Sequence, residues 1–379
     1  MERMHEQVEL TKAVLDMKPM KGIPQWMLHV MEIGIIEQVA GTKPGSYMKD
    51  PEGVYLKFQG ESATTFIDQY LARNPMSMTD HGYDAKAERG ATTGAAQVVR
   101  DGIVIDSPEA VCQHMEKFIF PQLEKAIAKY NPNDEAAMDK LIQEERRVQA
   151  EFGPAILKVP YGGFFSLPGF AYGHYGYEAY FMAYALYPEV MEKHYKLSAD
   201  LAVKRNILSA KAILKGKLPK VLRLDHDMAD SRGTLVREET LDKIWFPHLR
   251  RALEPLLNAG IRLLWHCDGN LMKMVPRLIE SGISGFQGFQ YEDGMDYVKI
   301  CRMKDRNGGP LMIWAGVSVT RTLPMGKPAD VTKEMKFLVE NGPPVGLVLG
   351  GSSSVAPGVP IANIRAMIEG RKYYLKHGR

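Results

Sequence analysis

The sequence predicts an α/β protein, a (β/α)8 TIM barrel with N-terminal helical and hairpin elaborations. Short apolar runs that end in Gly or polar residues alternate with helical patterns through the second half of the chain. Each helical pattern ends in a Gly, the residue expected just past a helix C-terminus. Nothing resembling GxGxxG follows the first strand, which favours a closed barrel over a doubly wound nucleotide-binding sheet.

Five runs in the second half have the character of buried parallel strands. They are "KVLRLDHDM" (220–228), "IRLLWHCDG" (261–269), "ISGFQGFQYE" (283–292), "PLMIWAGVSV" (310–319) and "VGLVLGGSSS" (345–354). Helical patterns lie between them, such as "REETLDKIWFPHLRRALEPLLNAG" (237–260), "LMKMVPRLIESG" (271–282) and "VTKEMKFLVENG" (331–342). The repeated order of strand, helix and Gly is the βα unit of a barrel.

The first half of the chain is less regular. "GIPQWMLHV" (22–30) and "PAILKVPYG" (154–162) have strand character, and an eighth strand is not obvious. "AAQVVRDGIVID" (95–106) carries Asp-Gly between two apolar runs, which predicts a β-hairpin. Residues 124–153 predict two charged helices broken at 131–134. We therefore expect one domain over 1–379, with a hairpin and helical insertion at about 95–150.

Composition excludes several classes of function. The net charge of +3 gives no basic field for nucleic acid or for an anionic membrane. No run of 18 apolar residues occurs, and the first twenty residues lack an apolar signal core. Three scattered cysteines, Cys112, Cys267 and Cys301, form no CxxC pair. A cytoplasmic protein that binds neither nucleic acid nor membrane is expected.

The C-terminal ends of the predicted strands are rich in polar residues. In a parallel barrel these ends meet on one face, so residues far apart in sequence become neighbours there. Several are carboxylates, which are costly to bury unless they are paired or bound to a metal. The residues collected in this way are His29, Tyr161, Asp225, His226, Asp227, His266, Cys267, Asp268, Gln290, Glu292, Ser318 and Ser352–Ser354.

The stretch "WHCDGN" (265–270) carries the first candidate site. In an extended segment His266 and Asp268 point to one side and Cys267 to the other. An imidazole with carboxylates is a zinc-competent set, which Asp227 and Glu292 would complete from neighbouring strand ends. In the alternative interpretation, Asp268 caps the helix that follows and His266 hydrogen-bonds to it.

The segment "VPYGGFFSLPGFAYGHYGYEAYF" (159–181) interleaves Phe and Tyr with Gly. After a barrel strand such a segment forms a loop whose rings stack on a flat substrate, or it packs the insertion. The candidate substrate contacts in it are Tyr161, Phe164, Phe165, Tyr172, Tyr175 and Tyr177. His29 and Ser353, at other strand ends, are further candidates.

"LGGSSS" (349–354) follows the last strand, where barrels often bind phosphate on backbone amides. The loop contains no Lys or Arg, which favours a polar wall over a phosphate grip.

Taken together, "HCDGN", "LIESGISGFQGFQYEDGMDYVKI", "AGVSV" and "LGGSSSVAPGVPIANIRAMIEGRKYY" resemble the C-terminal half of the uroporphyrinogen decarboxylase superfamily, over residues 220–375. "KGIPQWMLHVMEIG" resembles the N-terminal part only loosely. The resemblance implies a barrel with its pocket at the strand C-termini. Decarboxylases of this superfamily carry an Arg-rich N-terminal segment, whereas this segment offers His29 and Glu32.

Thiol-methylating members bind zinc through His-x-Cys and a distant Cys, and the matching positions here are His266, Asp268 and Ser353. Members with "HxDGN" resemble the methyltransferases of anaerobic O-demethylation. The resemblance therefore implies transfer of a methyl group from a small methoxylated, aromatic compound to cob(I)alamin. The chain shows no DxHxxG corrinoid motif, so the cobalamin is expected on a partner corrinoid protein.

The breaking of an aryl ether needs a Lewis-acidic metal or a protonated acid against the leaving oxygen. His266, Asp268, Asp227 and Glu292 are accordingly assigned to zinc binding or to leaving-group protonation, with the choice open. Two alternatives remain, a decarboxylase of a porphyrinogen-like or other acidic substrate and a non-catalytic barrel that binds a tetrapyrrole. The superfamily also implies a homodimer.

Overall fold

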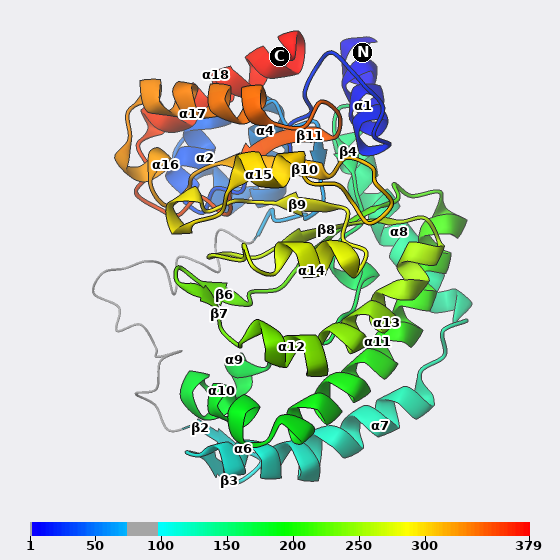
Figure 1. The fold of residues 1–379 in the computed structure, drawn as a ribbon. Helices are drawn as coiled ribbons and strands as arrows, with labels where there is room; N and C mark the ends of the chain where they lie inside the picture. Colours follow the sequence, from blue (N-terminus) through cyan, green and yellow to red (C-terminus); the bar gives the residue numbers. More distant parts are fainter. Residues whose placement is uncertain (1, 74–97) are drawn as a thin grey trace.

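The computed structural model describes residues 2–73 and 98–379 and has a mixed α/β fold (Figure 1). Its largest sheet has five parallel strands in the order β11-β10-β9-β8-β5. These strands are β5 (Val221–Asp225), β8 (Arg262–His266), β9 (Gly285–Gln287), β10 (Met312–Val317) and β11 (Leu347–Gly351). All five predicted strands of the second half are confirmed, although each is shorter than its apolar run.

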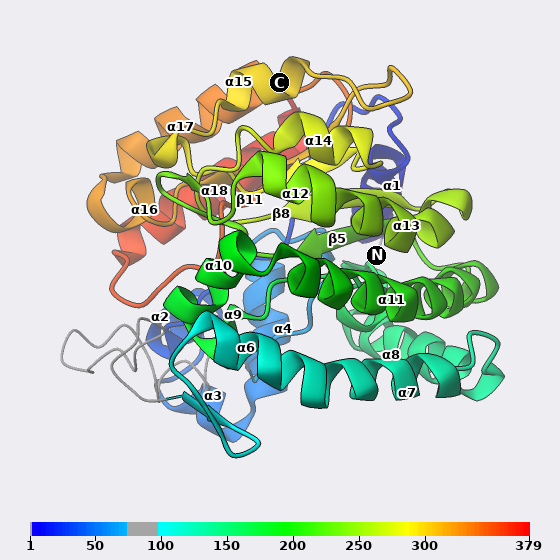
Figure 2. The same cartoon turned by 60° about the horizontal axis from the view of Figure 1, so that its bottom comes forward.

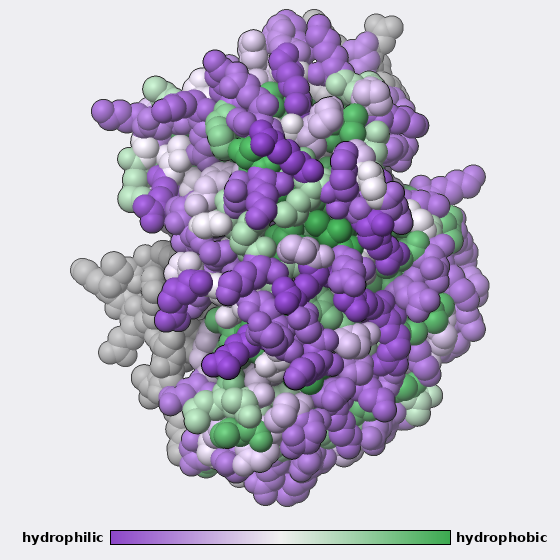
Figure 3. All heavy atoms as spheres, viewed as in Figure 1, coloured by the Kyte–Doolittle hydropathy of each residue, from purple (hydrophilic) through white to green (hydrophobic). Residues whose placement is uncertain are grey.

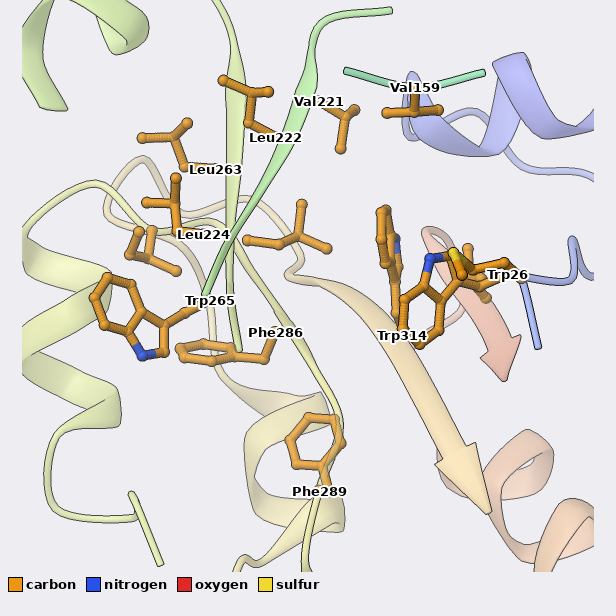
Figure 4. Packing of buried hydrophobic residues seen from close by; sticks show 14 of the residues in the cluster. Trp26, Val159, Val221, Leu222, Leu224, Leu263, Trp265, Phe286, Phe289 and Trp314 are labelled. Atoms are coloured by element: carbon orange, nitrogen blue, oxygen red, sulfur yellow. The ribbon is translucent and has the colours of Figure 1, made fainter. Parts of the chain in front are cut away.

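The two sides of this sheet differ because side chains alternate along each strand. Leu222, Leu224, Leu263 and Trp265 lie on the side of helices α12 (Glu238–Ile244) and α13 (Phe246–Asn258) (Figure 4). The ring of Trp265 lies 6.0 Å from that of Trp245, between those helices. On the other side, Trp314 packs 5.9 Å from Trp26. The side of the sheet with Trp314 also carries the polar strand ends.

Parallel pairing continues beyond the five strands. Gln25 bridges Leu349 of β11, and Trp26 bridges Phe66. Phe66 belongs to β1 (Phe66–Ile67), which pairs with β4 (Leu157–Lys158). The sequence missed β1, because two residues of strand are too short to show a period. In the described part of the chain no backbone ladder joins β4 to β5.

Helices follow the strands of the second half as predicted. They are α14 (Val275–Glu280), α15 (Tyr297–Arg302), α16 (Thr322–Met325), α17 (Pro328–Asn341) and α18 (Ile361–His377), in addition to α12 and α13. The single helix predicted over 237–260 is divided in two at Trp245, and Pro247 then occupies the first turn of α13. Gly260, with φ +71°, follows the C-terminus of α13 in a left-handed conformation.

The predicted insertion is also present. Strands β2 (Val98–Arg100) and β3 (Ile103–Ile105) pair antiparallel around Asp101 and Gly102, which both have positive φ as a type I′ turn requires. Residues 95–97 of the predicted hairpin lie outside the described residues. The helical part comprises α6 (Pro108–His114), the π-helical η1 (Met115–Ile119), α7 (Phe120–Lys129) and α8 (Glu135–Phe152).

The remaining elements surround this framework. The N-terminal helices are α1 (Glu2–Leu15), α2 (Ile33–Val39), α3 (Ser46–Lys49) and α4 (Pro51–Glu61). Between β4 and β8 lie η2 (Gly162–Phe164), α9 (Tyr172–Tyr175), α10 (Tyr177–Leu186), α11 (Pro188–Gly216) and the hairpin of β6 (Ala229–Asp230) and β7 (Gly233–Thr234). A 3-10 turn, η3 (Tyr291–Asp293), follows β9. Helix α11 packs against α7, α8 and α13, and Figure 2 shows α7 and α11 side by side.

The face shown in Figure 3 is covered mainly by polar side chains, with small separate apolar patches. Within the described residues no helix combines the length and the apolar character needed to cross a membrane.

Candidate functional site

Three neighbouring strands place polar side chains at one level of the sheet. Asp225 of β5 is the register partner of His266 in β8, and His266 is the partner of Gln287 in β9. Register partners in a parallel sheet point to the same side, so the three side chains share one face. His266 is only 6% exposed, and its Nδ1 lies 3.2 Å from the Gln287 carbonyl oxygen.

Asp268 lies beside His266, with 3.9 Å between Oδ1 and the His266 Nε2. Its backbone N–H donates to Oδ1 of Asp227 at 3.1 Å, and its own Oδ1 accepts from Nε2 of Gln290 at 3.3 Å. Ser353 Oγ lies 3.5 Å from Oδ2. Burial, together with the charges of Asp227 and Asp225, raises the pKa of Asp268. The structure therefore brings His266, Asp268, Asp227 and Ser353 together as the sequence predicted.

The helix-cap interpretation of Asp268 is wrong. Helix α14 begins after Met274 and has no side-chain cap. The local turn is instead held by Asn270, whose Oδ1 accepts from the Met272 N–H at 3.1 Å. Cys267 is turned toward backbone groups, because its sulfur accepts from the Met228 N–H at 3.2 Å. Burial raises the pKa of its thiol, which keeps it protonated.

Glu292 lies in η3, apart from the pair formed by His266 and Asp268. Its Oε1 accepts a hydrogen bond from Ser318 Oγ at 2.8 Å and another from the Thr320 hydroxyl. Over residues 2–73 and 98–379, no three His, Cys, Asp or Glu side chains are arranged so that they could hold a metal ion. Among the described residues, His266, Asp268, Asp227 and Glu292 are not gathered into a ligand set, and Glu292 is bonded to hydroxyl groups. Zinc binding by these four residues stays a prediction.

A buried arginine that sequence reasoning missed lies below this cluster. Arg223 Nε donates to Asp68 at 2.7 Å, and Nη1 donates to Asp225 at 2.9 Å. Its guanidinium is 4.6 Å from the ring centroid of Tyr161 and 5.1 Å from that of Trp26. The sequence signal was present, since Arg223 interrupts an apolar strand and shares a side with Asp225 two positions on. Burial opposes the charge of Asp225, but the His266 and Arg223 charges lower its pKa overall.

His29 comes from the segment that bridges β11. Its Nδ1 lies 2.7 Å from Ser354 Oγ. Burial, helped by the charge of Arg223, lowers the pKa of His29 to about 4, so its imidazole is neutral near pH 7. His29 therefore contributes a hydrogen-bonding group and no charge.

The aromatic segment divides into wall and core residues. Tyr161 donates to Asp225 Oδ2 at 3.0 Å, and its ring lies 5.7 Å from that of Phe165. The rings of Tyr172 and Tyr177 are 4.7 Å apart. Burial, then Tyr177 and the charge of Asp227, raise the pKa of Tyr172 to about 12.

Phe164 and Tyr175 do not belong to that wall. Phe164 is 2% exposed and packs in the hydrophobic core. Tyr175 stacks on Tyr180 at 5.8 Å, and its hydroxyl lies 2.9 Å from Nδ1 of His114 in the insertion. The prediction that these two contact substrate is corrected to a packing role, because alternating Gly and aromatic residues do not reveal which rings face inward.

His226 anchors the aromatic segment to the sheet. Its Nε2 accepts from the Phe170 N–H at 2.9 Å, and Trp245 Nε1 donates to the Pro168 carbonyl at 2.7 Å. Burial lowers the pKa of His226 to about 4, which keeps Nε2 available as an acceptor. The loop is therefore fixed at its centre.

The serines of "LGGSSS" all have protein partners. Ser352 Oγ accepts from the Val319 N–H at 3.1 Å, Ser353 faces Asp268, and Ser354 faces His29. These contacts favour the polar-wall interpretation over a phosphate grip.

The fold is similar to that of a solved structure. A methyltransferase from Methanosarcina mazei is similar with a TM-score of 0.54 and 13% sequence identity, over 97% of this chain and 98% of that chain. No protein-family model matches the sequence, and no curated protein matches it. At this identity the similarity shows a shared fold over nearly the whole length.

Proposed function

We propose that this chain is a methyltransferase of the uroporphyrinogen decarboxylase superfamily. It would move a methyl group from a small methoxylated aromatic compound to the cob(I)alamin of a separate corrinoid protein. The observation that supports this most is Asp268, a half-exposed carboxyl with a raised pKa that lies beside the buried His266 at the strand ends.

We further propose that the parallel segments close into a (β/α)8 barrel. Residues 25–26, β1 and β4 continue the order of the five-stranded sheet, which supplies eight segments in chain order. At the seam between β4 and β5, Lys158 Nζ donates to the Asp68 carbonyl at 2.8 Å, and Arg223 binds the Asp68 carboxylate. Side chains would thus replace the missing ladder. The open mouth would then receive the corrinoid protein.

In the proposed reaction, the C–O bond of the methoxyl group breaks and the aryl oxygen leaves as a phenol. The reduced corrinoid supplies the nucleophile that takes the methyl group. Asp268 would give its proton to the departing oxygen, because its raised pKa favours the protonated form. Gln290 and Ser353 would orient its two oxygens. No step is assigned to zinc, since the side chains as placed do not gather into a ligand set.

The surrounding rings would position the donor. Tyr161 is bonded to Asp225 of the carboxyl cluster and contacts Phe165, and Tyr172 contacts Tyr177. These rings would suit an aromatic donor. His226 holds the loop that carries Tyr172, so the stacking surface would be preorganised.

The decarboxylase alternative has less support. An acidic substrate would meet Asp225, Asp227 and Asp268, whereas Arg223 is already bound by two carboxylates.

The test uses free cob(I)alamin, whose absorbance changes on methylation, with methoxybenzene or 4-nitromethoxybenzene as donor. Wild type should consume cob(I)alamin with both. Asp268→Asn should lose about two to four orders of magnitude with methoxybenzene, as expected for a lost general acid. It should lose far less with the nitro ether, whose phenolate leaves without a proton.

Asp230→Asn is the matched control, because it removes a partly exposed carboxylate of the β6–β7 hairpin that is paired with Arg232. No methylation by wild type, or equal losses of Asp268→Asn with both donors, would contradict the proposal.

A further inference from the structure

The strand-end cluster is rich in carboxyl groups. The Asp268 N–H is bonded to the Asp227 carboxylate, and the side chain of Asp268 lies beside His266, the register partner of Asp225. Three carboxyl groups, those of Asp225, Asp227 and Asp268, therefore lie at neighbouring strand ends.

The arginine that could recognise a carboxylate is already occupied. Arg223 donates through Nε to Asp68 and through Nη1 to Asp225, and rings lie near its guanidinium. With its side chain 2% exposed, Arg223 is fixed there by two carboxylates. An incoming anion would have to displace Asp225, which would leave that carboxylate without its partner.

A buried amide adds a further acceptor on the same side of the sheet. Gln287 is 2% exposed, and its Nε2 donates to the Ser352 carbonyl at 3.2 Å. Its Oε1 has no hydrogen-bond partner in the described part of the chain. An unpaired buried acceptor favours a ligand that donates a hydrogen bond and disfavours one that only accepts.

We infer that the methyl donor of this site is uncharged or cationic and carries no carboxylate. This inference rests on the proposed function and deepens it by naming the charge class of the donor. Its chemical basis is repulsion, because a ligand carboxylate would approach several carboxyl groups, and Arg223, the described arginine that contacts them, is already held by Asp68 and Asp225. The cation that could instead attract a ligand carboxylate is Arg321, which is exposed and follows Thr320, the residue bonded to Glu292.

A matched series of ligands tests the inference by calorimetry on the full chain. 3-Methoxybenzyl alcohol, 3-methoxybenzylamine and 3-methoxybenzoate share the ring and the methoxyl group and differ in charge at neutral pH. We expect the benzoate to bind at least about tenfold more weakly than the alcohol at low salt. High salt should narrow this ratio, because screening weakens charge repulsion.

Variants distinguish repulsion by the carboxyl cluster from attraction by Arg321. Asp227→Asn keeps the acceptor of the Asp268 N–H but removes one charge, so it should improve benzoate binding several-fold relative to the alcohol. The control variant Asp230→Asn should leave the ratio of benzoate affinity to alcohol affinity unchanged. Arg321→Gln should also leave it unchanged, since Arg321 is not expected to hold the ligand.

Two failures can be told apart. If the benzoate binds as tightly as the alcohol, or if Arg321→Gln selectively weakens its binding, the charge inference is overturned, whereas methylation of cob(I)alamin is unaffected by that result. If the alcohol binds better than the benzoate but no ligand methylates cob(I)alamin, the charge inference stands and the proposed function fails. Binding of none of the three overturns the charge inference.

Discussion

Replacement of Asp68 by Asn should destabilise the fold strongly. The Asp68 side chain is fully buried, and its Oδ2 lies 2.7 Å from Nε of Arg223. Its Oδ1 accepts from Trp26 Nε1 at 2.8 Å. Loss of one partner of a buried pair leaves an uncompensated charge and costs about 3–5 kcal/mol. Because Asp225 still binds Arg223, we expect the lower end of that range, about 3 kcal/mol.

The assay is urea unfolding followed by tryptophan fluorescence, with the free energy taken from the midpoint and the slope. Asp230→Asn breaks an exposed pair with Arg232 and should change the midpoint little. A double variant with Asp68→Asn and Arg223→Met should recover part of the lost stability, since the buried guanidinium is then absent and only the partly exposed Asp225 loses an ion-pair partner. Equal midpoints for Asp68→Asn and Asp230→Asn would refute the reasoning.

Three further predictions concern the proposed chemistry. The turnover of an unactivated methoxyarene should fall as pH rises through the pKa of Asp268, because the proton needed by the leaving group is then lost. That pKa lies above its usual value. A pH–rate profile checks this prediction, and Asp268→Asn should flatten the profile. Tyr177→Ala removes the ring 4.7 Å from that of Tyr172 and should raise KM about two- to tenfold, in line with 0.5–1.5 kcal/mol for an aromatic pair. Dialysis against a chelator should leave methyl transfer unchanged. Elemental analysis provides the check: if wild type contains near-stoichiometric zinc and His266→Ala lacks it, the placement of Glu292 outside a ligand set is contradicted.

Much of the fold could be predicted from local pattern. The five apolar runs of the second half became strands because buried parallel strands need continuous apolar residues. The Asp101-Gly102 turn was equally clear, since few residues tolerate its positive φ. Strand β1 (Phe66–Ile67) escaped because its place depends on pairing with Trp26 and β4, contacts that no local pattern encodes.

Part of the candidate site could also be predicted from the sequence. Parallel strand ends meet, so His266, Asp268, Asp227 and Ser353 could be grouped from the sequence, and the structure groups them. The position of Glu292 depends on hydroxyl groups from the β10 loop, which strand order alone does not specify.

The role of Arg223 depends on Asp68, which lies 155 positions away in the chain. Its pairing therefore needed the tertiary structure, although a charged residue inside an apolar strand was a visible signal. The orientation of individual rings in the aromatic segment also needed the packed structure, as Phe164 and Tyr175 illustrate.

The most direct test of the central claim follows the methyl group itself. Wild-type protein is incubated with cob(I)alamin and 3-methoxybenzyl alcohol that carries a trideuterated methoxyl group, and the corrinoid and the aromatic products are analysed by mass spectrometry. We predict trideuteromethylcobalamin and 3-hydroxybenzyl alcohol in equal amounts, with a much slower reaction for Asp268→Asn. An unlabelled corrinoid beside unchanged donor would contradict the account.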